Sequence, residues 1–157
     1  MRAKDFFQRA LIAERELKLL NAQISHYRDL GLSITGGSMD SPVVSHSRGS
    51  SRVEMAAMGI FDSTRKLEEQ VREYTQIINE ARQVIRQVPQ DKYRQILTFH
   101  YLAGWSFRSI SDELRYNDPK SIYTAHRWAL EEAQKVLDRK GRNTNGNRRK
   151  DELPASD

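Results

Sequence analysis

Residues at alternating spacings of four and three form apolar seams along two long stretches of the chain. The first seam consists of Phe6, Ala10, Ala13, Leu17, Leu20, Ile24 and Tyr27. The second consists of Val53, Ala57, Ile60, Thr64, Leu67, Val71, Tyr74, Ile78, Ala81, Ile85 and Val88, with Thr64 as its polar interruption. A position that returns every 3.5 residues stays on one side of a supercoiled helix. Each stretch therefore predicts a long helix that needs a facing helix.

The segment between the two seams, residues 33–52, is rich in Ser and Gly and has no helical period. This composition predicts a flexible connector. A connector of this length lets the second helix fold back antiparallel on the first, and it equally permits exchange between subunits. We expect residues 1–88 to form an antiparallel helical hairpin or coiled coil that makes a homodimer or a higher homo-oligomer.

Three shorter helical patterns follow Pro89, which ends the second long helix. The first begins at Asp91 and ends before Gly104, and the second runs from Phe107 to Leu114 with Ser106 as its N-cap. The third begins at Pro119 after the cap Asp118 and ends near Arg139. Its predicted inner face contains Ile122, Ala125 or His126, Ala129, Ala133 and Val136. Residues 89–138 therefore predict a helix-turn-helix within an all-α protein.

A helix-turn-helix presents the N-terminal end of its last helix to the major groove of DNA. The exposed positions at that end are Lys120, Ser121, Tyr123, Thr124 and Arg127, and no acidic residue lies between Asp118 and Glu131. Lys and Arg bind guanine edges, whereas hydroxyl groups reach bases or phosphates. Together with Arg108 and Arg115, these residues are the candidate contacts to double-stranded DNA.

Composition narrows the remaining possibilities. The 157 residues contain 26 Lys and Arg against 21 Asp and Glu, a formal net charge of +5, and no Cys. Without Cys there is no disulfide framework, no Cys-type zinc site and no thiol nucleophile. No apolar run approaches the roughly 20 residues that span a bilayer, and the N-terminus lacks the apolar core of a signal peptide. We expect a cytoplasmic protein with no membrane partner.

Residues 139–157 have no apolar pattern, and residues 139–150 contain six basic residues and no acidic one. We expect this basic tail to be disordered and to attract phosphates without sequence preference.

Several segments resemble region four of bacterial sigma factors across roughly residues 88–137. They are Val88-Pro89, Tyr93-Arg94-Gln95-Ile96-Leu97, the run from Tyr101 to Leu114, Ser121-Ile122-Tyr123 and His126-Arg127-Trp128-Ala129-Leu130. With the opening Ala3-Lys4-Asp5-Phe6, the whole arrangement is similar to RinA/ArpU-type late transcription regulators of Gram-positive phages. The resemblance implies activation of phage late or packaging genes in a bacterial host cell, with RNA polymerase as a further partner.

The turn before the last helix, Arg115-Tyr116-Asn117, departs from the sigma-type pattern, which often has a Gly there. Asn117 is the candidate for the left-handed backbone position that Gly would take. This turn is also one residue longer than in the sigma-type pattern. Two alignments of the last helix, one residue apart, therefore stay open, and they place different residues against the bases.

The other conspicuous side chains favour structural roles. We expect Trp105 and Trp128 to pack in the core and His100 and His126 to lie at its edge. No His pair has metal-ligand spacing with a carboxylate, and no motif predicts a cofactor, a metal site or catalysis. The expected protein is not an enzyme.

Two alternatives stay open. A small terminase subunit, which marks viral DNA for packaging, also combines a helix-turn-helix with coiled-coil helices, usually in the opposite order. Alternatively, the sigma-like segment docks on RNA polymerase and never reads DNA.

Overall fold

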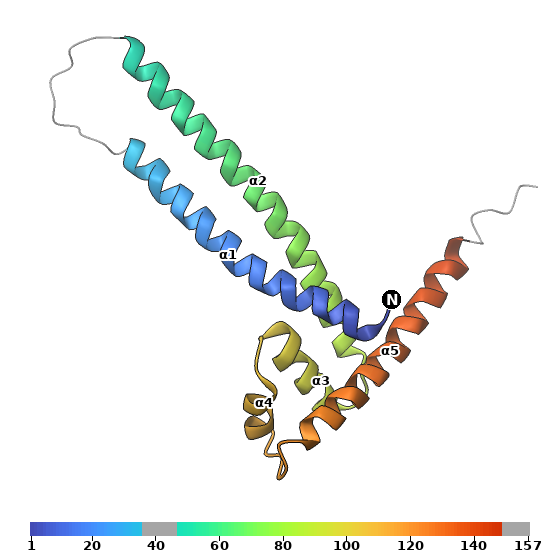
Figure 1. Cartoon of the computed structure of the whole chain (residues 1–157). Coiled ribbons are helices and arrows are strands. Elements are labelled where there is room, and N and C mark those ends of the chain that lie inside the picture. The colour runs from blue at the N-terminus through green and yellow to red at the C-terminus, as the bar shows by residue number, and fades with distance from the viewer. Residues whose placement is uncertain (36–46, 149–157) are drawn as a thin grey trace, which may run out of the picture. The chain divides into compact units, whose positions relative to one another are not determined.

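The computed structural model describes residues 1–35 and 47–148, and within these ranges all regular structure is helical (Figure 1). Its elements are α1 (Ala3–Thr35), α2 (Ser47–Arg86), α3 (Asp91–Leu97), the π-helix η1 (Thr98–Leu102), α4 (Phe107–Glu113) and α5 (Ser121–Arg148). The predicted all-α class is therefore confirmed for the described part of the chain.

The chain divides into two compact units that differ from the predicted boundary at residue 88. One unit comprises Met1–Glu14 together with Ile77–Asp157, and the other comprises Arg15–Gln76. We refer to them as the terminal unit and the two-helix unit. The first turns of α1 and the last turns of α2 thus belong with α3, α4 and α5, because their apolar residues share one core.

The main core of the terminal unit draws on every helix of that unit except α4. Its buried members are Ala3, Phe7, Ala10, Leu11, Ala81, Val84, Ile85, Val88, Leu97, Tyr101, Ala129, Ala133 and Val136. A second cluster, formed by Ile96, Ile110, Ile122 and Ala125, joins α3, α4 and α5. Burial of these side chains removes apolar surface from water and holds the short helices against α5.

The two-helix unit keeps α1 and α2 side by side (Figure 1). Arg28 Nη2 lies 3.3 Å from Glu68 Oε1, and a Cβ on Gly31 would lie 3.8 Å from Ile60. The seam residues from Ala57 to Tyr74 are half-buried, but Val53, at the start of the predicted second seam, is 48% exposed. One facing helix therefore covers only part of each seam side chain of α2 in this unit.

Both ends of the predicted 33–52 connector are helical, because α1 continues to Thr35 and α2 already begins at Ser47. Ser and Gly are weaker helix formers than Ala by up to about 1 kcal/mol each, a preference that an established helix overrides. Only residues 36–46 of this connector lie outside the described residues.

The predicted tail is also helical over its first part, since α5 continues to Arg148, about nine residues beyond its predicted end near Arg139. No Pro stops the chain before Pro154, and an established helix continues through weak helix formers such as Gly141 and Asn143. The rest of the tail, residues 149–157, lies outside the described residues.

Gly104 ends the helical segment that starts at Asp91, as predicted, and its positive φ of 73° explains why Gly stands there. The segment is not one regular helix, because its last turn widens into η1, where Ala103 N–H donates to Thr98 O over 3.0 Å. Ser106 then caps α4 as predicted: its Oγ accepts a hydrogen bond from Ser109 N–H at 3.1 Å.

The turn after α4 corrects the prediction for Asn117, because the left-handed residue is Arg115, with φ 54°. Tyr116 N–H donates to Ser111 O at 3.0 Å, and Arg115 N–H donates to Asp112 O at 3.2 Å. This pair of bonds is the Schellman motif, which requires positive φ at the residue directly after the C-cap Leu114. The helix end therefore decides which residue takes that conformation.

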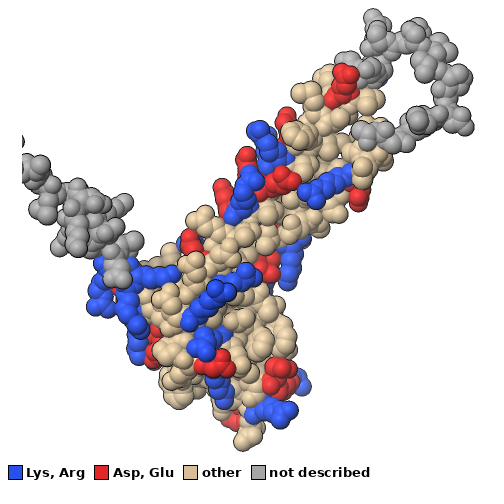
Figure 2. All heavy atoms as spheres, turned by 180° about the vertical axis from the view of Figure 1, so that it is seen from behind, with Lys and Arg blue, Asp and Glu red and all other residues tan. Residues whose placement is uncertain are grey.

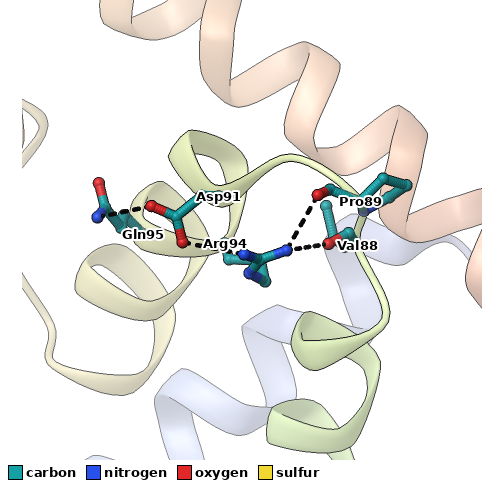
Figure 3. A network of polar contacts seen from close by, with 5 residues as sticks. All are labelled: Val88, Pro89, Asp91, Arg94 and Gln95. Carbon is teal, nitrogen blue, oxygen red and sulfur yellow. Dashed lines mark hydrogen bonds and ion pairs between the residues drawn. The ribbon is translucent and has the colours of Figure 1, made fainter.

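Arg94 joins the end of α2 to the start of α3 (Figure 3). Its Nη1 donates to Val88 O at 2.8 Å and to Pro89 O at 3.0 Å, and its Nη2 lies 3.0 Å from Asp91 Oδ1. Gln95 Nε2 also donates to Asp91, at 3.1 Å. Arg94 thereby gives a donor to two carbonyl groups at the junction, where α2 has ended and no helical N–H reaches them.

Candidate nucleic-acid interface

The start of α5 is set by the turn that precedes it. Asp118 Oδ1 accepts a hydrogen bond from Lys120 N–H at 3.0 Å, and Asp118 O accepts one from Ser121 N–H at 3.0 Å. Asp118 therefore caps this segment as predicted, although the regular α-helix begins at Ser121, two residues after Pro119. The cap fixes the chain direction at the end of α5 that carries the candidate DNA contacts.

The predicted inner face of α5 is confirmed. Ile122, Ala125, Ala129, Ala133 and Val136 are at most 6% exposed, and His126 is half-buried. These positions follow the 3.6-residue period, so the remaining positions of the first turns face outward. The outward set comprises Lys120, Ser121, Tyr123, Thr124 and Arg127, all of which are exposed.

The two remaining candidate contacts lie on α4 and at its end. Arg108 and Arg115 are exposed, and α4 itself is held by Ile110, which is fully buried against α3 and α5. Tyr123 extends over α4 as well: its ring centroid lies 5.0 Å from that of Phe107. The seven candidate residues therefore lie on the exposed surface of α4, α5 and the turn between them.

The charge of this surface is mixed. Arg127 Nε is 4.0 Å from Glu131 Oε1, and both side chains are largely exposed, so the pair is weak.

Figure 2 shows Lys and Arg gathered where the described part of α5 ends, whereas both signs are interspersed along the two-helix unit. The basic residues of that end include Arg139, Lys140 and Arg142.

Both tryptophans are more exposed than predicted. Trp105 is 38% exposed and stacks on Phe99 with ring centroids 4.6 Å apart, and Trp128 is 48% exposed. The expectation of core packing was wrong. Trp105 stacks on Phe99 while remaining partly exposed, and the small residues Ala125 and Ala129 fill the inner face of α5 beside Trp128. The indole of Trp128 is left on the flank of α5.

A hollow of about 380 Å³ lies beside that flank, within the terminal unit. Its lining includes Lys92, Tyr116 and Trp128 together with the candidate contacts Ser121 and Thr124. Lys92 Nζ lies 4.0 Å from the centre of the Tyr116 ring, a cation–π contact. Sequence reasoning missed Lys92 because it is remote from α5 along the chain, and it treated Tyr116 only as part of the turn before α5.

His100 and His126 lie at the core edge, as predicted, in a cluster with Tyr101 and Phe107. His126 Nε2 lies 3.0 Å from Tyr101 Oη, and the two histidine rings are 5.5 Å apart. Burial, with smaller contributions from His100 and Lys4, lowers the pKa of His126 from 6.5 to about 4. Burial also raises the pKa of Tyr101 to about 12. At neutral pH both side chains are therefore uncharged.

Among residues 1–35 and 47–148, no group of His, Asp and Glu is arranged to hold a metal ion. In the same part of the chain, no helix has the length and apolar character needed to cross a bilayer. No family model, no curated protein and no solved structure matches this chain.

Proposed function

We propose that this protein is a sequence-specific DNA-binding regulator of transcription that activates phage late or packaging genes. In this proposal α4 is the support helix and α5 the reading helix of a helix-turn-helix. The observation that carries the proposal is the row of exposed hydrogen-bond donors on the first turns of α5, backed by an inner face of buried apolar residues. The similarity to sigma region four and to RinA/ArpU-type regulators supports the transcriptional role and RNA polymerase as a partner.

The side chains divide by chemistry. Lys120 and Arg127 are suited to the O6 and N7 acceptors of guanine, and Thr124 is suited to a base edge or a thymine methyl group. The hydroxyl groups of Ser121 and Tyr123 and the guanidinium groups of Arg108 and Arg115 are suited to phosphates. In this scheme the first group specifies the sequence and the second group positions the helix.

Simultaneous replacement of Lys120, Thr124 and Arg127 by Ala is expected to abolish the preference for the target sequence. Each lost base contact removes about 1–3 kcal/mol of discrimination, so a specific site becomes equivalent to unrelated DNA. The measurement is a gel shift with fragments tiled across the neighbouring genome, at near-physiological salt and with competitor DNA.

The control for this variant is Lys66→Ala with Arg72→Ala, which removes two positive charges from the two-helix unit and should leave the preference intact. Uniform, salt-sensitive binding of all fragments by the unmodified protein would contradict specific reading. A docking role on RNA polymerase would then replace it.

We further propose that the protein works as a homodimer joined through the two-helix unit. Among the described residues of this unit, only two hydrophobic side chains are buried, Leu20 and Ile24. Seven large hydrophobic side chains are exposed there: Leu19, Leu30, Leu32, Val53, Met55, Met58 and Phe61. Met55, Met58 and Phe61 follow each other at intervals of three and therefore lie along one side of α2. A second copy would cover this surface and present a second reading helix to a second half-site.

Replacing Met58 and Phe61 with Lys is expected to convert the dimer to a monomer, because two charges would then have to be buried in the interface. Light scattering coupled to size-exclusion chromatography measures the mass. Ile12→Lys changes an exposed apolar residue of the terminal unit and should leave the dimer unchanged. A monomeric unmodified protein would disprove the dimer, and a ring of many subunits would favour a small terminase.

A further inference from the structure

The hollow beside the first turns of α5 is built from three segments of the terminal unit. Lys92 comes from the first turn of α3, Tyr116 from the turn after α4, and Ser121, Thr124 and Trp128 from α5. Tyr116 is half-buried and packs against the cluster of Ile96, Ile110, Ile122 and Ala125, so its ring is held in place. The wall of the hollow is therefore anchored to the core.

The chemistry of the lining suits an anion. Seven of the eight residues around the hollow have a side chain that donates a hydrogen bond, Ala125 being the exception, and none of the eight is acidic. The ammonium group of Lys92 is held near the hollow by its contact with the Tyr116 ring, 4.0 Å away. The indole N–H of the partly exposed Trp128, hydroxyl groups and one ammonium together are complementary to the oxygen atoms of a phosphodiester.

The position of the hollow relative to α5 points to a particular anion. Ser121 and Thr124 belong both to its lining and to the proposed reading surface. A helix in the major groove, which is about 12 Å wide, has a sugar–phosphate backbone along each flank. The flank of α5 that carries Trp128 therefore faces one DNA strand when the first turns of α5 read the bases.

We propose that this hollow binds the sugar–phosphate backbone of one strand of the DNA that α5 reads, with Lys92, Tyr116 and Trp128 as contacts. This inference rests on the proposed DNA-binding function and adds three residues to it. Lys92 supplies the positive charge, and the Tyr116 hydroxyl and the Trp128 Nε1–H donate to phosphate oxygens. Such contacts fix the position of α5 on the duplex and are the same for every base sequence.

The experiment compares Lys92→Ala, Lys92→Arg and the control Lys66→Ala in the full chain, on the target fragment and on unrelated DNA. Lys92→Ala is expected to bind both DNAs about tenfold more weakly. The slope of log affinity against log salt should fall by about 0.9, the value for one phosphate contact. Lys92→Arg keeps the charge and should bind as the unmodified protein does. Lys66→Ala removes the same charge from the two-helix unit and should change neither quantity.

A second readout observes the hollow directly. The chain has two Trp residues, so Trp105→Phe leaves Trp128 as the sole indole and keeps a ring that can stack on Phe99. In this background, the emission of Trp128 should change on saturation with DNA, because an indole that is 48% exposed to water would contact a phosphate. Trp128→Phe should weaken binding to both DNAs alike.

The outcomes separate the two proposals. Specific binding by the unmodified protein, with Lys92→Ala equal to Lys66→Ala and no change in Trp128 emission, would overturn the backbone contact and leave specific reading in place. Weak binding by Lys92→Arg along with a lowered melting temperature would also overturn it, since Lys92 would then act through the fold. Absence of any DNA binding by the unmodified protein would overturn both.

Discussion

Replacement of Phe7 with Ala is expected to lower the free energy of unfolding of the terminal unit by about 3–5 kcal/mol, because it opens a cavity in a packed core. Phe7 is fully buried, and its ring stacks on Tyr101 with centroids 5.3 Å apart. Its cluster includes Ala129 and Ala133 of α5, so the loss reaches the helix that carries the proposed DNA contacts. The melting temperature, followed by circular dichroism, should fall by about 10–20 °C.

The matched control is Ile12→Ala, five residues further along α1. Ile12 is 48% exposed, so its truncation should cost less than about 1 kcal/mol. Equal effects of the two substitutions would show that the N-terminal turns of α1 do not belong to the core of α5. With the expected difference, residues 89–138 alone would lack part of their core, so DNA-binding experiments require the full chain.

Acidification from pH 6.5 to pH 4 is expected to destabilise the terminal unit through His126. Its pKa is about 4 in the folded protein and 6.5 in an unfolded chain, so between these values the unfolded state binds more protons. The contribution of His126 to the free energy of unfolding is therefore fully present above pH 6.5, and it declines as the pH falls towards 4. Because His126 is only half-buried and solvent screens part of the effect, the difference in pKa corresponds to a loss of at most about 2–3 kcal/mol. Urea unfolding at several pH values measures it.

His126→Gln isolates this contribution, since Gln does not titrate and its side-chain amide can still meet the Tyr101 hydroxyl, which is 3.0 Å from His126 Nε2. This variant should lose less stability than the unmodified protein over the same pH interval. His26→Gln, at an exposed position of α1, is the control. It should lose as much stability between pH 6.5 and pH 4 as the unmodified protein does. The same pH dependence in all three proteins would assign the acid sensitivity to other groups.

Local signals in the sequence predicted much of the terminal unit. The 3.6-residue period of small and branched residues identified the inner face of α5, and Ser106 and Asp118 were recognised as caps because their side chains accept hydrogen bonds from N–H groups two or three residues later. The stop at Gly104 followed from its freedom to adopt positive φ. These features depend on residues within a few positions of each other.

Three predictions were wrong or incomplete, the first two at local positions and the third because it needed contacts between residues distant in the chain. Trp128 was expected in the core because of its size, yet the position that it occupies on α5 lies beside the buried row. The left-handed residue was expected at Asn117, but the hydrogen bonds that end α4 place it at Arg115. The boundary at residue 88 separated helices whose side chains share one cluster.

The sequence by itself determined the all-helical class, the helix caps and the set of exposed residues on the first turns of α5, because each of these depends on local spacing. Only the tertiary structure brought Phe7 against Tyr101, and Lys92 beside Tyr116, Ser121 and Trp128. Such neighbours are set by how the helices pack, and packing joins residues that are far apart in the chain and have no common periodicity.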